Sequence, residues 1–320
     1  MIRLLVPKMP TRDDLLPYLK EIDESQWYSN FGPLERSLCA RLSDRYGAHV
    51  VTVGSCTAGL ELMYWYWKKC GHDTIELPSL TFPATILAAR RAGLRVKFAD
   101  VDPETWTHPA VAGFGVASDG TWVDAAAAFG DQKVRRHQTA VFSLHATKTV
   151  GAGEGGFIVT HNAQLAERWQ RQTNFGFRDG ISQYWGTNAK LSEYHAAVAH
   201  ASLDAWDPEP WLRLDGWYRR YLPLFVKQQK RPPGVYPILA VLLPQEVSVE
   251  GVSQRLCTRG IETRRWYWPS MHQHPTCGDP EARLPITEEI SDRLLGLPYH
   301  LFLTEDDVKR VCATLSEEIL

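Results

Sequence analysis

Apolar positions in the first half of the chain follow two alternating periods. Segments with helical spacing mostly end near a glycine, and short apolar runs of strand length stand between them. The predicted helices span 34–46, 57–69 and 84–92, and the predicted strands span 50–53, 74–77, 95–99, 122–125, 140–144 and 157–160. This strand–helix–strand rhythm predicts an α/β domain whose mostly parallel sheet is covered by helices on both faces.

The pattern changes after a long predicted helix at 191–203, where Asp207-Pro208-Glu209-Pro210 interrupts it. Beyond this break the chain predicts a smaller α+β unit, with helices at 211–227, 249–259, 288–295 and 304–320 and strands at 235–243 and 261–267. We therefore expect a large domain at 1–205 and a small C-terminal domain at 206–320.

Composition and charge narrow the function classes. The 320 residues carry a formal charge of −2 with both signs interspersed, which gives no electrostatic reason to bind nucleic acid or an anionic membrane. No apolar run approaches the roughly 18 residues of a membrane span, and residues 1–7 are too short for a secretory signal. The six cysteines form no CxxC pair. We therefore expect a cytoplasmic protein with free thiols and no metal site.

Two small-residue segments at predicted strand ends are candidates for ligand contact, since ligands bind beyond the carboxyl ends of strands in open parallel sheets. The segment 54–59 (Gly-Ser-Cys-Thr-Ala-Gly) leads from a strand into a helix, whose free N–H groups suit a phosphate. A plain tight turn with Thr57 as helix cap is the alternative. Asp124 ends an apolar strand before small residues, where it could hold a pyridine nitrogen or merely cap a helix.

A lysine and an aromatic residue complete the series. Lys148 follows a predicted strand and precedes a glycine-rich turn, with Ser143 and His145 before it. A lysine amine becomes nucleophilic when its surroundings lower its pKa, although a surface lysine beside a hairpin would look the same. Phe82, in the segment 78–82, could stack on a heteroaromatic ring or pack in the core. The order of these candidates along the chain is informative. A turn suited to phosphate, an aromatic residue, an acid and a lysine come in this order at successive predicted strand ends.

These motifs resemble those of the DegT/DnrJ/EryC1/StrS sugar aminotransferases, which have the type I fold of pyridoxal-phosphate (PLP) enzymes. The most specific match is Ser143-Leu144-His145-Ala146-Thr147-Lys148 with Gly153-Glu154-Gly155-Gly156, close to the lysine motif of that family. The resemblance runs from about residue 27 to the C-terminus. Its supporting stretches are 78–82, 123–126, 186–193, 260–264 and 297–300.

The resemblance implies a PLP site. Lys148 would form the internal aldimine and move the proton between the cofactor and the substrate carbon. Asp124 would pair with the pyridine nitrogen, Phe82 would stack on the ring, and His145 would lie beside the cofactor.

It also implies the contacts of the phosphate and a shared active site. The backbone amides of Thr57 and Ala58, with the Ser143 hydroxyl, would hold the phosphate. Asn188 would reach the phosphate of a neighbouring subunit, so the enzyme would be a homodimer.

The implied reaction has two halves. L-glutamate or glutamine gives its amine to PLP, making PMP, which then aminates a nucleotide-linked 4-keto- or 3-keto-6-deoxyhexose.

Arg264, Trp266 and Tyr267 lie where the small domain of the family faces substrate. An arginine there could pair with a diphosphate and an aromatic could stack on a base, or these residues could form a hydrophobic core.

The sequence departs from the family in two places. Ala127 stands where the family commonly has glutamine or histidine near the cofactor, and 102–122 is short, with room for one segment such as 110–116. We therefore expect a trimmed sheet edge. Two alternatives stay open: a non-catalytic PLP-fold protein that binds a sugar nucleotide or a partner, and an aminotransferase acting on a keto-inositol. Lysine at 148, where related sugar dehydratases have histidine, favours transamination.

Overall fold

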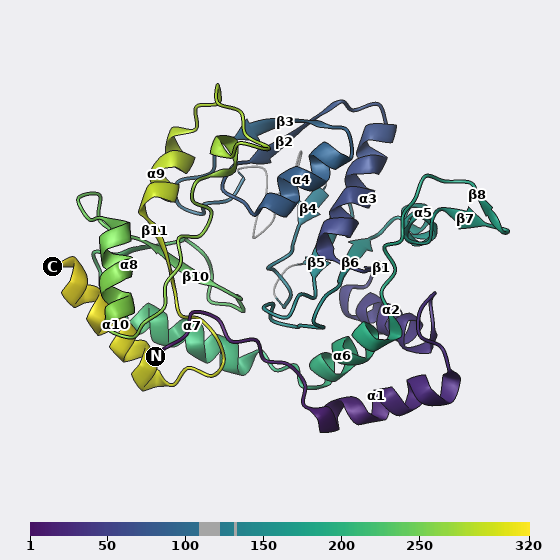
Figure 1. Ribbon diagram of the computed structural model, residues 1–320, viewed down its shortest axis with the longest axis horizontal. Helices are drawn as coiled ribbons and strands as arrows, with labels where there is room; N and C mark the ends of the chain where they lie inside the picture. Colours follow the sequence, from purple (N-terminus) through teal and green to yellow (C-terminus); the bar gives the residue numbers. More distant parts are fainter. Residues whose placement is uncertain (109–121, 131–132) are drawn as a thin grey trace.

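The computed structural model describes residues 1–108, 122–130 and 133–320 (Figure 1). The segment 110–116 lies outside these ranges. The elements up to residue 204 are α1 Arg12–Ser25, α2 Pro33–Tyr46, β1 His49–Val53, α3 Cys56–Lys69, β2 Thr74–Pro78, α4 Pro83–Arg91, β3 Arg95–Ala99, β4 Trp122–Asp124, β5 Thr139–Ser143, β6 Gly156–Thr160, α5 Ala163–Thr173, β7 Phe177–Arg178, β8 Ile181–Ser182 and α6 Glu193–Asp204.

The central sheet has the order β1-β6-β5-β4. β4 pairs with β5 in parallel, whereas β6 is antiparallel to both of its neighbours, so β1, β5 and β4 run in one direction and β6 is reversed. β2 and β3 form a separate parallel pair. The predicted fold class is confirmed: an α/β sheet with helices on both of its faces, as Figure 1 shows.

Both faces of the central strands are buried, which explains their continuous apolar sequences. Phe142 and Phe157 face the side covered by α2 and α6, where their rings stack with centroids 4.8 Å apart. Val141 and Ile158 face the opposite side, covered by α3 and α5. Because successive residues of a strand point to opposite faces, a strand between two helical layers needs apolar side chains at every position.

Polar caps set where several helices begin. Ser55 is the N-cap of α3, since its Oγ accepts a hydrogen bond from Ala58 N, so the helix starts one residue before the predicted position. α1 starts with a capping box in which Thr11 and Asp14 exchange hydrogen bonds. The sequence interpretation missed α1, α5 and the β7–β8 hairpin. It also treated Thr57 as a possible cap, a position that Ser55 takes.

The C-terminal part is α+β, as predicted, but several of its elements differ. Its elements are α7 Glu209–Tyr221, β9 Lys227–Gln228, β10 Leu239–Leu242, α8 Val249–Thr258, the 3₁₀ turn η1 Met271–Gln273, α9 Pro285–Arg293, β11 Leu294–Leu297 and α10 Glu305–Ile319. The antiparallel sheet β11-β10-β9 packs with α7, α8 and α10 around one core. None of the helices in the described ranges has the length and apolarity that crossing a membrane requires.

Four of the predicted C-terminal elements were wrong in extent or type. The strand expected at 235–243 is shorter, at Leu239–Leu242. The helix expected at 211–227 ends at Tyr221, just before Pro223, which cannot continue it. The strand expected at 261–267 forms only two isolated bridges, and Tyr267 has a φ of +57° that breaks an extended path. The helix expected at 288–295 ends at Arg293, and the chain continues directly into β11.

Two segments pack across the predicted boundary at residue 206, which itself remains a prediction. Met271, Cys277 and Leu284 belong to the same hydrophobic cluster as the α3 and α4 side chains. Ile2 instead packs in the C-terminal core, and Leu4 O accepts a hydrogen bond from Tyr299 N. The segment 271–284 is therefore tied to the sheet domain by its apolar side chains.

Candidate active site

A glycine-rich turn folds back on the segment that carries Lys148. Ala146 N donates to Gly153 O over 2.9 Å, and Leu144 N donates to Gly155 O over 3.0 Å. Gly153 and Gly155 have φ values of +84° and +136°, which favour glycine. The turn fixes the backbone of the 144–148 segment at the end of β5.

The Lys148 amine is half-buried and, within the part of the chain that the structure describes, has no hydrogen-bond or ion-pair partner at Nζ. Burial lowers the pKa of this amine, and attraction to Cys56 and Asp124 opposes the shift. A lowered pKa increases the fraction of neutral amine, which is the nucleophilic form. Lys148 thus has the properties of a group that attacks a carbonyl.

Asp124, the last residue of β4, is held as an acceptor. Thr85 Oγ1 donates to its Oδ2 over 2.7 Å, and Ala126 N donates to its Oδ1 over 3.0 Å. Burial raises the pKa of the carboxyl, while the bonds from Thr85 and Ala126 and the charge of Lys148 lower it. Asp124 and Lys148 therefore influence each other electrostatically and share one polar region at the ends of β4 and β5.

The start of α3 offers backbone donors near the end of β5. A Cβ on Gly156 would lie 2.6 Å from Phe142 O and 2.8 Å from Cys56 N, so glycine lets β6 pass between β5 and the helix start. Ala58 N already donates to Ser55 Oγ over 3.1 Å, whereas Thr57 N has no partner among the described residues. Of the two amides expected to hold phosphate, Thr57 has the available N–H.

Ser143 and His145 lie at the same strand end. Ser143 is buried, and its Oγ accepts a hydrogen bond from His145 N over 3.1 Å. In the hydrogen bonds of the described ranges this hydroxyl only accepts, so its proton can be donated to an anion. His145 Nδ1 lies 2.9 Å from Thr147 Oγ1, and its Nε2 lies 3.7 Å from Glu154 Oε1.

Phe82 is 60% exposed although it belongs to a large apolar residue type. It is the N-cap residue of α4, and Pro83 follows it at the first helical position. Thr85, which binds Asp124, lies one turn further along the helix. Phe82 therefore precedes the helix that holds Asp124, and its ring has surface available for stacking.

Asn188 is exposed near the β7–β8 hairpin, and the next residue, Ala189, accepts a hydrogen bond from Gly54 N over 2.7 Å, at the start of the 54–59 turn. Lys190 Nζ donates to Asn188 Oδ1 and to Asn174 Oδ1, both over 2.9 Å. The hairpin projects beyond α5 (Figure 1). It exposes Ile181 and, at its base, Trp185, which are 64% and 63% exposed.

The three substrate-binding candidates of the small domain, Arg264, Trp266 and Tyr267, have different surroundings in the structure. Tyr267 interacts electrostatically with Asp124, and burial raises its pKa to about 12, so its ring faces the same region. The Arg264 guanidinium lies over the Trp266 ring, 4.8 Å from its centroid. Trp266 packs closely on Gly296 of β11, which makes it a structural neighbour of the small sheet.

Sequence reasoning missed two residues of this region, Thr85 and Cys56. Thr85 makes the shortest hydrogen bond to Asp124, and Cys56 is a buried thiol whose raised pKa reflects burial and the charge of Asp124. Neither has a motif of its own, since both are helix residues whose roles come from distant strands. Together with the unpaired amine, the carboxylate and the exposed aromatic, they form a set that fits PLP.

Comparison with known proteins places the chain in a family. Residues 11–112 and 121–316 match the DegT/DnrJ/EryC1/StrS aminotransferase family. The interruption between 112 and 121 falls within the short segment noted in the sequence.

A relative from Shigella dysenteriae, dTDP-4-amino-4,6-dideoxy-D-glucose transaminase, is 26% identical over 364 aligned positions that cover 97% of each chain. Since this chain has 320 residues, that relative contains residues that this chain lacks.

Two solved structures are similar over nearly the full length. One, from Bacillus cereus ATCC 10987 and named as a PLP-dependent aminotransferase, has a TM-score of 0.91 and 27% identity, covering 98% of this chain and 99% of its own. DesI, solved in the presence of its TDP-sugar product, has a TM-score of 0.82 and 31% identity, with 98% and 93% covered. The predicted family, enzyme class and cofactor are confirmed. The chain belongs to the DegT/DnrJ/EryC1/StrS aminotransferase family and is a PLP-dependent aminotransferase.

Proposed function

We propose that this enzyme moves an amino group from L-glutamate, or glutamine, to the ketone of a nucleotide-linked 4-keto- or 3-keto-6-deoxyhexose, with PLP carried by Lys148. The observation that carries the proposal is the half-buried amine of Lys148. Its pKa is lowered, and among the described residues it has no partner. An amine in this state is a nucleophile prepared for a carbonyl.

We assign a separate role around the PLP ring to each candidate residue. When bound, PLP supplies an electron sink for the carbon that loses a proton. Asp124, kept as an acceptor by Thr85, pairs with the pyridine nitrogen, and Phe82 covers the ring. Lys148 Nζ would move the proton, since the lowered pKa of its amine increases the fraction of the neutral form, which is a base. His145 would lie beside the cofactor.

The phosphate is assigned to Thr57 N, with the Ser143 hydroxyl as a second donor. Both groups have protons available, and a helix N-terminus attracts an anion. Ala58 can join only if it shares the N–H that Ser55 now accepts.

A second copy of the chain completes the site in this proposal. Asn188 is exposed beside the projecting hairpin, whose aromatic surface suits an interface. We assign Asn188 to the phosphate of the neighbouring subunit and the assembly to a homodimer.

The nucleotide sugar is supported by the two relatives that are named for dTDP or TDP sugars. Tyr267 and Arg264 of the small domain are assigned to the substrate, and Trp266 contributes by fixing the Arg264 guanidinium.

An absorption titration tests the proposal. Pure protein mixed with PLP should develop a visible band of protein-bound cofactor, and Lys148→Ala should abolish it. Added L-glutamate should convert the wild-type band to that of PMP, and a TDP-linked keto sugar should restore it, whereas a keto-inositol should not. A wild-type protein that forms no band contradicts the proposal.

A further inference from the structure

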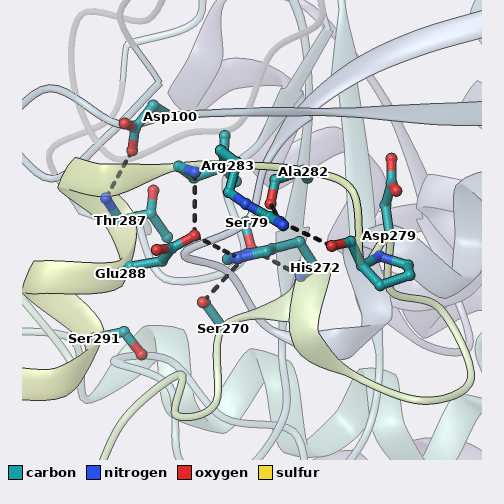
Figure 2. A network of polar contacts seen from close by, with 12 residues as sticks. Ser79, Asp100, Ser270, His272, Asp279, Ala282, Arg283, Thr287, Glu288 and Ser291 are labelled. Atoms are coloured by element: carbon teal, nitrogen blue, oxygen red, sulfur yellow. Dashed lines mark hydrogen bonds and ion pairs between the residues drawn. The ribbon is translucent and has the colours of Figure 1, made fainter.

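A buried polar network connects the end of β2 with the segment that leads into α9 (Figure 2). Ser79 directly follows β2, and its Oγ lies 2.7 Å from His272 Nδ1. His272 Nε2 lies 3.1 Å from Glu288 Oε1, in the first turn of α9. Ser79 is 0% exposed and His272 is 4% exposed. The network therefore joins the sheet domain to the 271–293 segment far along the chain.

The protons of this network can be assigned from its acceptors. An ionised Glu288 only accepts, so His272 Nε2 carries a proton and donates it. In the neutral ring, Nδ1 then accepts from the Ser79 hydroxyl, whose oxygen in turn accepts from His272 N over 2.9 Å. Each group has a partner for each role, which is what a buried network needs to be rigid.

Serine, histidine and glutamate in this order also form hydrolytic nucleophile sites, but this arrangement is unsuited to that chemistry. The Ser79 hydroxyl is fully buried, so a substrate carbonyl cannot approach it. Its oxygen also accepts a backbone hydrogen bond from His272 N. The geometry points to a positional role.

Hydrogen bonds at the start of α9 fix the position of Glu288. The Asp100 carboxylate, just after β3, accepts from Ile286 N over 3.0 Å and from Thr287 N over 2.7 Å. Glu288 Oε1 itself accepts from Leu284 N over 3.2 Å. The glutamate that orients His272 is therefore fixed against the sheet domain.

From Ser79 the hydrogen bonds continue to Asp124. Ser79 O accepts from Thr81 N over 3.0 Å, and Thr81 Oγ1 lies 3.1 Å from Thr85 Oγ1. Thr85 uses its only proton on Asp124, so Thr81 must be the donor to Thr85. Met271 N also donates to Ser79 O, over 3.0 Å. Hydrogen bonds, together with the covalent bonds within Ser79 and Thr81, therefore connect Glu288 to Asp124.

We propose that His272 is a positioning residue for the cofactor. Through Ser79 it holds the segment 79–82, and so sets the place of Phe82 and of the threonine pair that keeps Asp124 an acceptor. The role rests on the proposed function, because Phe82 and Asp124 are its targets. It would transmit the position of the 271–293 segment to the cofactor ring.

The test compares PLP binding by three variants: Ser79→Ala, His272→Gln and Glu288→Gln. Each should weaken PLP binding by roughly three- to tenfold in an absorption titration, because Ser79→Ala removes a buried hydrogen bond, a glutamine at 272 cannot bridge both of its partners, and Glu288→Gln replaces a charge-assisted bond by a neutral one. Each should also shift the pH at which the bound-cofactor band changes colour. His274→Gln is the matched control: His274 Nε2 contacts Pro269 O within the same segment, and this variant should keep the wild-type values.

A second measurement needs no cofactor. Hydrogen exchange of the apo protein should become faster in peptides covering 79–85 for Ser79→Ala and Glu288→Gln, and stay unchanged for His274→Gln. Glu288→Gln keeps the test usable if Ser79→Ala does not fold, since Glu288 is partly exposed. The proposal is overturned if the variants lower the unfolding temperature but leave both PLP affinity and the band's pH profile at wild-type values. If the wild-type protein shows no absorption band with PLP, the proposed function is contradicted. In that case the positional role of His272 is still tested, because unchanged hydrogen exchange of residues 79–85 in the variants overturns it.

Discussion

Replacing Thr85 with valine should destabilise the protein more at neutral pH than at acidic pH. Thr85 Oγ1 donates to Asp124 Oδ2 over 2.7 Å, and burial already raises the pKa of this carboxyl. Valine keeps the shape of threonine but has no donor. The ionised carboxylate therefore loses more stabilisation than the protonated carboxyl does, and the pKa of Asp124 rises further.

The size of the effect follows from the strength of the bond. A hydrogen bond to a charged group contributes about 1.5–3 kcal/mol and one to a neutral group about 1 kcal/mol, and one pKa unit corresponds to about 1.4 kcal/mol, so Thr85→Val should raise the pKa of Asp124 by about 0.5–1.5 units. A carboxyl whose folded-state pKa is raised contributes stability below its unfolded pKa, and that contribution is lost as pH rises through the folded pKa. Thr85→Val enlarges this loss. We expect a cost of about 1 kcal/mol at acidic pH and about 1.5–3 kcal/mol once Asp124 is ionised.

The assay is urea unfolding of the cofactor-free protein at about pH 4, near the ordinary pKa of an aspartate, and at about pH 8, where the carboxyl is more ionised. Thr139→Val is the matched control, because Thr139 Oγ1 donates to Thr160 Oγ1 over 3.0 Å, both partners are neutral, and valine again removes the donor. The control should lose a similar free energy at both pH values. Equal costs for Thr85→Val at the two pH values would refute the reasoning that Thr85 keeps Asp124 ionised.

Three further predictions concern packing, assembly and a buried ion pair. Gly156→Ala should destabilise the fold by about 1–3 kcal/mol in urea unfolding, since its Cβ would meet Phe142 O at 2.6 Å; a cost near zero would show that β6 can move away. Ile181→Ser should raise the dimer dissociation constant in sedimentation without lowering the unfolding temperature of the monomer, because Ile181 is 64% exposed in the single chain. Asp215→Asn should lower the free energy of unfolding by about 3–5 kcal/mol, since it leaves the buried Arg231 without its carboxylate partner. Urea unfolding should give the same loss at all salt concentrations, and a loss that high salt removes would contradict burial of the pair.

The sequence predicted the fold best where local pattern and long-range packing agree. Apolar runs at 140–144 and 157–160 are strands because both faces of the sheet are covered. Lys148 and Asp124 could be singled out because each follows such a strand, and parallel strands bring their carboxyl ends to one edge. The two side chains are electrostatically coupled in the structure, as that reasoning requires.

The remaining elements depend on features that a pattern does not contain. No glycine or proline separates α9 from β11, so their boundary at Arg293 has no sequence signal. Tyr267 turns the chain with a left-handed φ that an aromatic residue rarely adopts, and the expected strand ends there. Thr85 and Asp124 lie 39 positions apart, and Ser79 and His272 lie 193 apart. Such pairs meet only through the tertiary fold, so periodicity cannot reveal them.

The attachment point of the cofactor is the most direct test of the account. Protein loaded with PLP is reduced with borohydride, which makes the link to an amine permanent, and is then digested and analysed by peptide mass spectrometry. If Lys148 carries the cofactor, we expect one pyridoxyl group per chain, on the peptide that contains Lys148. A group attached to any other lysine, or no attachment in protein that is otherwise folded, would contradict it.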